Sequence, residues 1–411
     1  IDNVNVTGYM SNVEFIEEKY GVEYALASWT LSAYSVAFAS FILFFGRVAD
    51  IVGHQKTFVT GLFFLGIFSI ITAVVDNIYV IIVFRALQGL AASATVPPSF
   101  AIIANSFTGK SLNIALGALS GILVISFGIG IILGGAFAET SIGYKGIGWV
   151  TTGCAFLCCA ASFFALKPIE QKISAGSLHK LDYIGVFIFI SAAILLVTGF
   201  TEAGESWKKP RAYVPIIVSV LLFLFFFLWE TVILTGKRAK NIDLFVPKKM
   251  WKIRNFKSLP VTALLLYGSF FCIILISVEY ARIVVGNSPI ISAVKIIPFF
   301  VTLFIFTIIF SLIYGKYLSP KWCCFTGIVL ALVGSILLTR MRESNTSYWK
   351  FGLPGFILAA TGLNLYFINY LNLITLATPL EMQGLISGIC LTMGQLGTAI
   401  FFSVITSLIG N

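Results

Sequence analysis

Charged side chains are scarce in this sequence. Lysine, arginine, aspartate and glutamate together make up 11% of the 411 residues, whereas ordinary soluble domains contain about 25%. Hydrophobic residues account for 58%, and the mean hydropathy is +0.98. A soluble protein of this composition would expose large apolar patches to water. The composition therefore excludes a soluble globular protein and predicts an all-α polytopic membrane protein with no additional soluble domain.

Histidine is almost absent, and the cysteines have no polar partners nearby in the sequence. The chain has two histidines, and its seven cysteines all lie within apolar segments. Metal sites need convergent ligands, and the sequence shows no nucleophile motif or phosphate-binding loop. We therefore expect no enzyme activity, no metal and no cofactor. The cysteines are expected to be buried thiols rather than disulfides.

Apolar stretches of the length that spans a bilayer as helix recur along the chain. Pro97 and Pro98 should kink one of them. The segment before residue 14 resembles the end of a further span, so we expect the chain to begin inside its first membrane helix. The twelve predicted spans lie near residues 25–45, 57–75, 78–104, 112–137, 147–166, 181–200, 212–234, 258–283, 290–314, 321–339, 350–376 and 384–409.

Basic residues outnumber acidic ones by 27 to 17, which gives a net charge of +10. When the loop that follows span 25–45 is taken as cytosolic, sixteen lysines and arginines fall in loops on that side and eight on the other. This asymmetry is typical of cytosolic loops, and the acidic segment 14–24 fits the outer side. The charge therefore sets orientation in a membrane, and we expect no nucleic-acid partner.

Two related halves are indicated by an internal repeat. Residues 117–122 (GALSGI) match residues 384–389 (GLISGI), an offset of 267 residues, and the segment at Gly46 has an echo at Gly315, an offset of 269. Similar offsets are typical of transporters built from repeated helix bundles. The predicted domains are an N-terminal bundle (1–167), a linker with two inserted membrane helices and a basic cytosolic loop (168–257), and a C-terminal bundle (258–411).

A glycine-marked, charged segment follows the first complete span. Glycines allow helix ends to approach closely, Asp50 is expected to cap or pair, and Lys56 to stay on the aqueous side. The segment resembles the loop between helices 2 and 3 of the major facilitator superfamily, although Ile51 and His54 replace basic residues of that pattern. The predicted gate residues are Gly46, Asp50, Gly53 and Lys56.

Further motifs, in the expected order, resemble the fourteen-helix drug:proton antiporter group of this superfamily, of the fungal aminotriazole-resistance type. The resemblance implies two six-helix bundles plus two inserted helices, with part of helix 1 and all of helix 14 lacking. Ile131 stands where the helix-5 antiporter motif has proline, which weakens the implication of export. The motifs are carried by Asp2, by Arg85 to Gly89, by Gly130, Gly134 and Gly135, by Asp182 to Gly185, and by Glu381 to Gly388 followed by Gln395.

Ionisable residues inside membrane helices are functional candidates because their burial is costly. Arg85 lies well inside its span, and the resemblance pairs it with Asp2 on helix 1. We predict that these two residues couple proton transfer to transport; a static ion pair between helices is the alternative. Glu279 and Arg282 are three residues apart, so they could pair on one helix face as a structural or gate pair.

Amide and phenol side chains make one of the late spans unusually polar. Residues eight apart share a helix face, so these side chains could line a central substrate cavity, or could form hydrogen bonds between helices. The candidates are Asn364, Asn369, Asn372 and Tyr366, together with Gln88 and Gln395.

These features predict a proton-coupled secondary transporter that moves small organic compounds, of the drug-export type, by alternating access. Two alternatives remain: a facilitator or importer of a small cation such as ammonium or a polyamine, and a receptor-like relative that transports nothing. The expected partners are a small molecule or ion, protons and membrane lipids. We expect a monomer in the plasma membrane, with the vacuolar membrane as the second choice.

Overall fold

The computed structural model describes residues 1–107, 109–165, 182–203, 206–234, 248–253, 256–313, 320–342, 347–377 and 383–409. All regular elements in these ranges are helices, as expected. They are α1 (Asp2–Met10), α2 (Val13–Tyr20), α3 (Tyr24–Val52), α4 (His54–Val74), α5 (Ile78–Ser93), α6 (Val96–Ser106), α7 (Gly109–Ala138), α8 (Tyr144–Ala165), α9 (Tyr183–Glu202), α10 (Pro210–Leu228), η2 (Trp229–Ile233), η4 (Lys248–Lys252), α11 (Ser258–Glu279), η5 (Tyr280–Val284), α12 (Pro289–Ile313), α13 (Pro320–Leu338), η6 (Tyr348–Gly352), α15 (Leu353–Ala377) and α16 (Gln383–Ile409).

Eleven helices within the described ranges are long and apolar enough to cross a membrane, and a shorter apolar stretch covers Gly388–Phe402 of α16. Each of the twelve predicted spans corresponds to one of these segments. Large apolar side chains such as Leu157, Phe164 and Phe187 are more than two-thirds exposed on the flanks. Such a surface is stable only against lipid, so the chain is an integral membrane protein.

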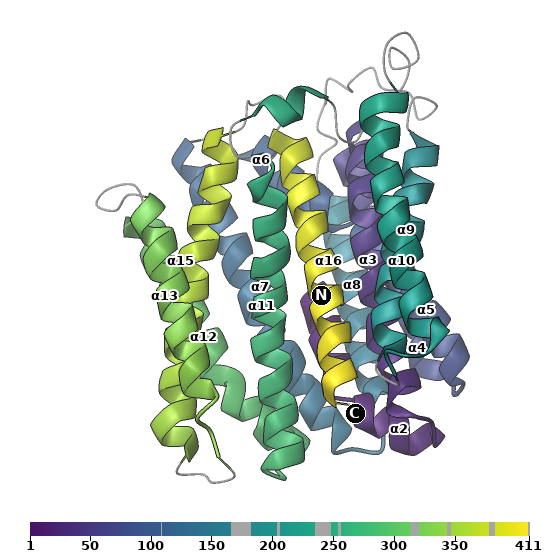
Figure 1. Cartoon of the computed structure of the whole chain (residues 1–411), viewed down its shortest axis with the longest axis vertical. Helices are drawn as coiled ribbons and strands as arrows, with labels where there is room; N and C mark the ends of the chain where they lie inside the picture. Colours follow the sequence, from purple (N-terminus) through teal and green to yellow (C-terminus); the bar gives the residue numbers. More distant parts are fainter. Residues whose placement is uncertain are drawn as a thin grey trace.

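The membrane helices run roughly side by side along the long axis of the molecule (Figure 1). Within the first half, α3 packs on α5, and α4 packs on α8. Within the second half, α11 packs on α16, and α13 packs on α15. The halves meet where α7 packs on α12 and α3 packs on α16. Two helix–helix seams therefore hold the halves together.

The inserted pair α9 and α10 lies beside one of these seams. The Ser219 hydroxyl donates to the backbone oxygen of Ala192 at 2.7 Å and ties α10 to α9. Asp182 caps α9 by accepting from the Gly185 N–H at 2.9 Å, and it also accepts from the Trp229 indole N–H at 2.9 Å. Helix α9 contacts both α3 and α16, so the pair touches both halves.

The turn between α3 and α4 is shorter than the sequence predicts. We expected residues 46–57 to form the connection, but α3 continues to Val52 and α4 begins at His54. Gly53 alone makes the turn, with a φ of +111°. Because side chains rarely adopt this backbone conformation, glycine is required there. The sequence predicted a longer loop because charged residues and glycines are typical of loops, whereas here they continue the last turn of α3 and the first turn of α4.

The predicted kink at Pro97 and Pro98 is confirmed as a break in the helix. Helix α5 ends at Ser93, and α6 begins two residues after Ala94, with both prolines in its first turn. Proline is well tolerated in a first turn, where no intrahelical N–H bond is lost. The same break brings Pro97 against Gly46 of α3, where an added Cβ would lie 3.6 Å from the proline ring.

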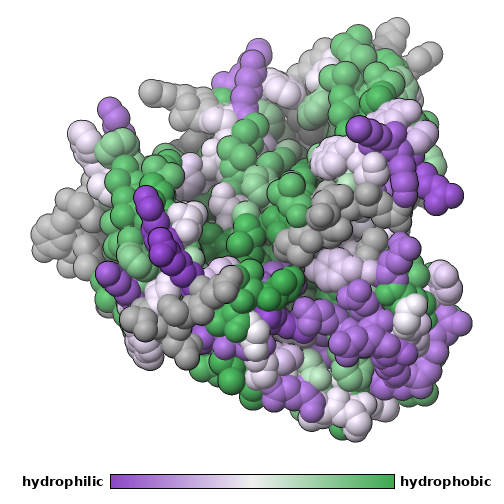
Figure 2. Space-filling model, turned by 60° about the horizontal axis from the view of Figure 1, so that its bottom comes forward, coloured by the Kyte–Doolittle hydropathy of each residue, from purple (hydrophilic) through white to green (hydrophobic). Residues whose placement is uncertain are grey.

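We use the term outer end for the end that holds α2, the α4–α5 turn and η5, following the orientation predicted from the lysines and arginines. This end lies at the bottom of Figure 1. Figure 2, in which the outer end comes forward, shows hydrophilic side chains gathered over one part of it, next to hydrophobic ones. The opposite end, where α3 meets α4, is the inner end.

Candidate functional site

Arg85 is completely buried among polar and aromatic groups of the first half. Its guanidinium carbon lies 3.9 Å from the ring centre of Tyr9 and 4.5 Å from that of Tyr34. Its Nε donates to the backbone oxygen of Thr30 at 2.6 Å, and Nη1 donates to the Asn5 side chain. Cation–π contacts and hydrogen bonds thus replace the water that a charged guanidinium loses on burial.

Asp2 reaches Arg85 through Tyr34 and not directly. The Tyr34 hydroxyl donates to the Asp2 carboxylate, and the ring of the same tyrosine covers the guanidinium of Arg85. Arg85 and Asp2 form no ion pair, and within the described part of the chain Nη2 of Arg85 has no hydrogen-bond partner. The predicted pair is therefore a three-residue unit, which we call the Asp2–Tyr34–Arg85 unit.

Gln88 belongs to the same hydrogen-bond network. Its Oε1 accepts from Arg85 Nη1 at 2.8 Å, and its Nε2 donates to Ser69 at 3.2 Å and to Thr72 at 2.9 Å. The next residue, Gly89, lies against the Tyr34 backbone, where an added Cβ would clash. Gln88 therefore orients Arg85 from within the first half by hydrogen bonds, which was the alternative left open by the sequence, and its role in a substrate cavity stays a prediction.

The three glycines of the predicted antiporter motif lie on α7. They form the surface on which α1 and α12 pack against this helix. An added Cβ at Gly130 would meet the Val4 backbone, and one at Gly134 would lie 2.8 Å from the Gly8 Cα. Gly135 faces α12, where an added Cβ would lie 2.8 Å from the backbone oxygen of Pro289. Close packing here does not need the missing proline, because glycine supplies it.

The predicted cavity residues of α15 take part mainly in helix packing. Asn364 Nδ2 donates to the backbone oxygen of Leu303 at 2.9 Å and to Thr307 at 2.6 Å, both on α12. Asn369 donates to the backbone of its own helix, and Tyr366 is half-buried. The side chain of Asn372 lies outside the described residues. Gln395 on α16 is half-buried, and its role in a cavity stays a prediction.

The gate residues at the inner end are arranged as the motif suggested, apart from the shorter turn. The His54 Nε2 lies 3.8 Å from the Asp50 carboxylate, one helical turn away across Gly53. Lys56 is exposed at the start of α4. The charged residues thus bracket the turn, and their function as a gate stays a prediction.

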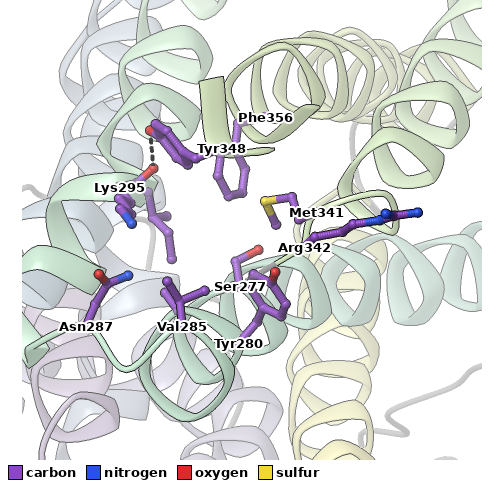
Figure 3. Close-up of a pocket in the computed structure, with 11 residues that line it drawn as sticks. Ser277, Tyr280, Val285, Asn287, Lys295, Met341, Arg342, Tyr348 and Phe356 are labelled. Atoms are coloured by element: carbon purple, nitrogen blue, oxygen red, sulfur yellow. Dashed lines mark hydrogen bonds between the residues drawn. The ribbon is translucent and has the colours of Figure 1, made fainter. Parts of the chain in front are cut away.

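A small pocket opens at the outer end of the second half (Figure 3). The Tyr348 hydroxyl donates to the Lys295 backbone oxygen at 2.8 Å, and the Lys295 ammonium lies 5.6 Å from the Tyr348 ring centre. The amide of Asn287 also lines the pocket, while the guanidinium of Arg342 extends away from it (Figure 3). This pocket lies away from the Asp2–Tyr34–Arg85 unit, at the opposite half of the molecule.

A second charged cluster lies in the α4–α5 turn at the outer end. Asp76 accepts from the ammonium groups of Lys19 and Lys145, each at 2.7 Å. These two hydrogen bonds lower the pKa of the Asp76 carboxyl to about 2. The cluster therefore ties α2 and α8 to the turn at every physiological pH.

We expect Asp76→Asn to lower the thermal stability of the protein slightly, by less than about 1 kcal/mol, because the carboxylate is 58% exposed and its ion pairs are screened. Since its pKa is depressed, this stabilisation is present above pH 4 and is lost as the pH falls toward 2. Melting temperatures of both proteins, measured from pH 7 down to pH 2, test this. The control is Glu18→Gln, because Glu18 is exposed and takes part in none of the ion pairs among the described residues. An equal effect of both variants would contradict the prediction.

Sequence reasoning missed the residues that surround Arg85. Asn5 follows Asp2 by three residues and so shares its helix face, a signal that was present in the sequence. Tyr9 and Tyr34 contact Arg85 across helix packing, at separations of 76 and 51 residues (85 − 9 and 85 − 34). No local pattern predicts such contacts, so the tyrosines could be found only in the folded structure.

Comparison with known proteins places this architecture in a family. The chain is 23% identical over 405 residues to the tetracenomycin C resistance and export protein of Streptomyces glaucescens, covering 96% of this chain and 72% of that protein. It is 27% identical over 285 residues to the multidrug transporter mfsC of Aspergillus fumigatus, covering 69% and 52%. The human organic anion transporter MFSD10 has a similar fold, with a TM-score of 0.60, 16% identity and coverage of 98% and 84%.

The profile of the Major Facilitator Superfamily matches residues 3–402, almost the whole chain. Members of this family are transporters of small molecules and not enzymes. The all-helical architecture described above is thus a family fold. This chain belongs to the Major Facilitator Superfamily.

Proposed function

We propose that this protein is a proton-coupled secondary transporter that exports small organic compounds by alternating access. The observation that carries the proposal is the Asp2–Tyr34–Arg85 unit. In it the hydroxyl of Tyr34 binds a membrane-embedded carboxylate, and the ring of the same tyrosine covers a permanently charged, buried guanidinium. Ionisable residues are so costly inside a membrane that they mark proton or substrate pathways. The unit lies between α1, α3 and α5, within the first half.

In this proposal Asp2 binds the proton. Arg85 stays protonated at all relevant pH values, so it supplies a fixed positive charge. Protonation of Asp2 removes the negative charge that the Tyr34 hydroxyl and the nearby cation stabilise. The hydrogen bond between α1 and α3 is then weakened, and a change in helix packing becomes coupled to the protonation state.

The substrate class is inferred from the relatives. Those with printed functions include a tetracenomycin C export protein, a puromycin resistance protein of Streptomyces alboniger and a multidrug transporter. These compounds are organic molecules, and their proteins are efflux or resistance factors. We extend that class, and the outward direction, to this chain and place it in the plasma membrane as a monomer.

Flux through proteoliposomes that contain the full-length protein tests the proposal. The panel consists of lipophilic drugs, ammonium and polyamines, each measured with and without an imposed pH gradient. Drug movement against an opposing proton flow supports the proposal. Cation movement that ignores the gradient would establish a facilitator instead, and failure to move any solute of the panel would leave a receptor-like protein as the interpretation to test.

A further inference from the structure

Polar contacts join the two halves at the outer end. Arg282 of η5 forms an ion pair with Glu14 of α2, and its Nη1 lies 3.5 Å from the Ser11 backbone oxygen. The Tyr24 hydroxyl at the start of α3 donates to Oε1 of Glu279 at 3.5 Å. The two halves cannot separate at this end unless these contacts break.

A further contact closes the same end beside the α7–α12 seam. The Glu139 carboxylate accepts from the Ile290 backbone N–H at 3.2 Å. Gly135, one turn earlier on α7, lies directly against the backbone of Pro289. The outer end is therefore closed by hydrogen bonds and by tight backbone packing.

Glu279 is unusual among the groups at this end because it is buried without a counter-charge of its own. It is 4% exposed, and its Oε2 has no hydrogen-bond partner among the residues that the structure describes. The charged and titratable groups that face it are Tyr24 from α3, Glu14 from α2, and Arg282 in the next helical turn. Arg282 is engaged by Glu14, so an ionised Glu279 would be poorly compensated. The closed arrangement therefore suits the neutral carboxylic acid.

We propose that Glu279 is a second proton-binding site, which latches the outer end shut when it is protonated. When the halves part, Glu279 meets water and releases its proton to the outer solution. Arg282 then exchanges Glu14 for the Glu279 carboxylate, which is three residues away and within reach on the same helix. Only an O–H bond breaks and re-forms, so the proton returns to the side from which it came.

This inference rests on the proposed function, because it assumes that the outer end opens. It differs from the role of Asp2, since Glu279 lies in the other half and its proton is not carried across the membrane. Because the closed state binds one more proton than the open state, acid outside the membrane favours the closed state. The transporter would then open less readily toward an acidic medium.

The latch can be tested by measuring the separation of the halves with paired spin labels. Glu18 on α2 and Arg340 after α13 are exposed residues of opposite halves at the outer end. Each is replaced by cysteine and labelled, in full-length protein whose native cysteines have been replaced. Double electron–electron resonance in liposomes at pH 5 to 8 reports closed and open populations. We expect the closed-to-open ratio to rise by up to about tenfold per unit of acidification.

The variants Glu279→Gln and Glu279→Met should remain closed and lose this pH response. Two variants are used because the apolar methionine keeps the protein testable if the amide disturbs folding. Glu23→Gln is the matched control: it removes an exposed carboxylate next to Tyr24 and should leave the response unchanged. A response that persists in both Glu279 variants overturns the latch, as does a wild-type protein that opens without regard to pH.

Failure of the latch and failure of the proposed transport function give different experimental results. The spin-label distances report opening of the outer end, whereas flux reports transport and its coupling to protons. Asp2→Asn should lose proton-driven flux and keep the pH-dependent closure. If flux is indifferent to protons while closure still responds to pH, the latch stands and the coupling proposal falls.

Discussion

Asp2→Asn should reduce transport driven by a pH gradient by at least about 100-fold, the scale of effect that a positioned proton-transfer group commonly has. Asparagine has nearly the same shape and can still accept the hydrogen bond from Tyr34, so the packing of α1 on α3 is retained. It cannot bind and release a proton in the relevant range. Flux in proteoliposomes, with and without the gradient, is the measurement.

The controls for this variant separate coupling from folding. The melting temperature of Asp2→Asn in detergent should stay close to that of the wild type. Tyr34→Phe keeps the ring over Arg85 but removes the hydroxyl that reaches Asp2, so we expect it to lower gradient-driven flux less than Asp2→Asn does. If Asp2→Asn transports at the wild-type rate, Asp2 is a structural residue and the coupling role is wrong.

Gly134→Leu should strongly destabilise the protein. The site faces the backbone of Gly8, and Asn12 Nδ2 donates to the Gly134 backbone oxygen at 2.9 Å, so α1 and α7 are held at close range. A leucine side chain would force the helices apart and break that hydrogen bond. Overpacking of this kind typically costs about 1–3 kcal/mol, and two backbones have little freedom to relax.

The matched control is Gly153→Leu on α8, where an added Cβ would meet nothing within 4 Å. Both variants change the helix propensity and the hydrophobicity in the same way. Thermal unfolding in detergent should therefore show a large drop for Gly134→Leu and little change for Gly153→Leu. Equal melting temperatures for the two variants would show that the contact between α1 and α7 does not limit stability.

The sequence was sufficient for the number and position of the membrane helices, because hydrophobic length is a strong local signal. It also located Arg85 and the glycines of α7, since an embedded charge and clustered small residues are visible in one segment. It failed where partners come from distant segments. Tyr34 stands between Asp2 and Arg85, and Arg282 pairs with Glu14 of the other half and not with Glu279.

The expected pair of Glu279 and Arg282 shows the reason for that failure. Their spacing of three residues permits a contact on one helix. The spacing cannot show that tertiary packing brings a competing carboxylate from another helix close to Arg282. In the structure Glu14 of α2 occupies that position. A local rule gives the contacts a residue can make, and the tertiary arrangement decides among them.

The apolar contacts of the inserted pair with both halves have a mechanical consequence. Helix α9 rests on both halves through Ala193 and Val197, which meet Ala39 and Val36 of α3 and also Leu396 and Ala399 of α16. All of these contacts are between apolar side chains, and none of them is a hydrogen bond. In the proposed alternating-access cycle, one half could therefore shift against the inserted pair without breaking a hydrogen bond at these contacts.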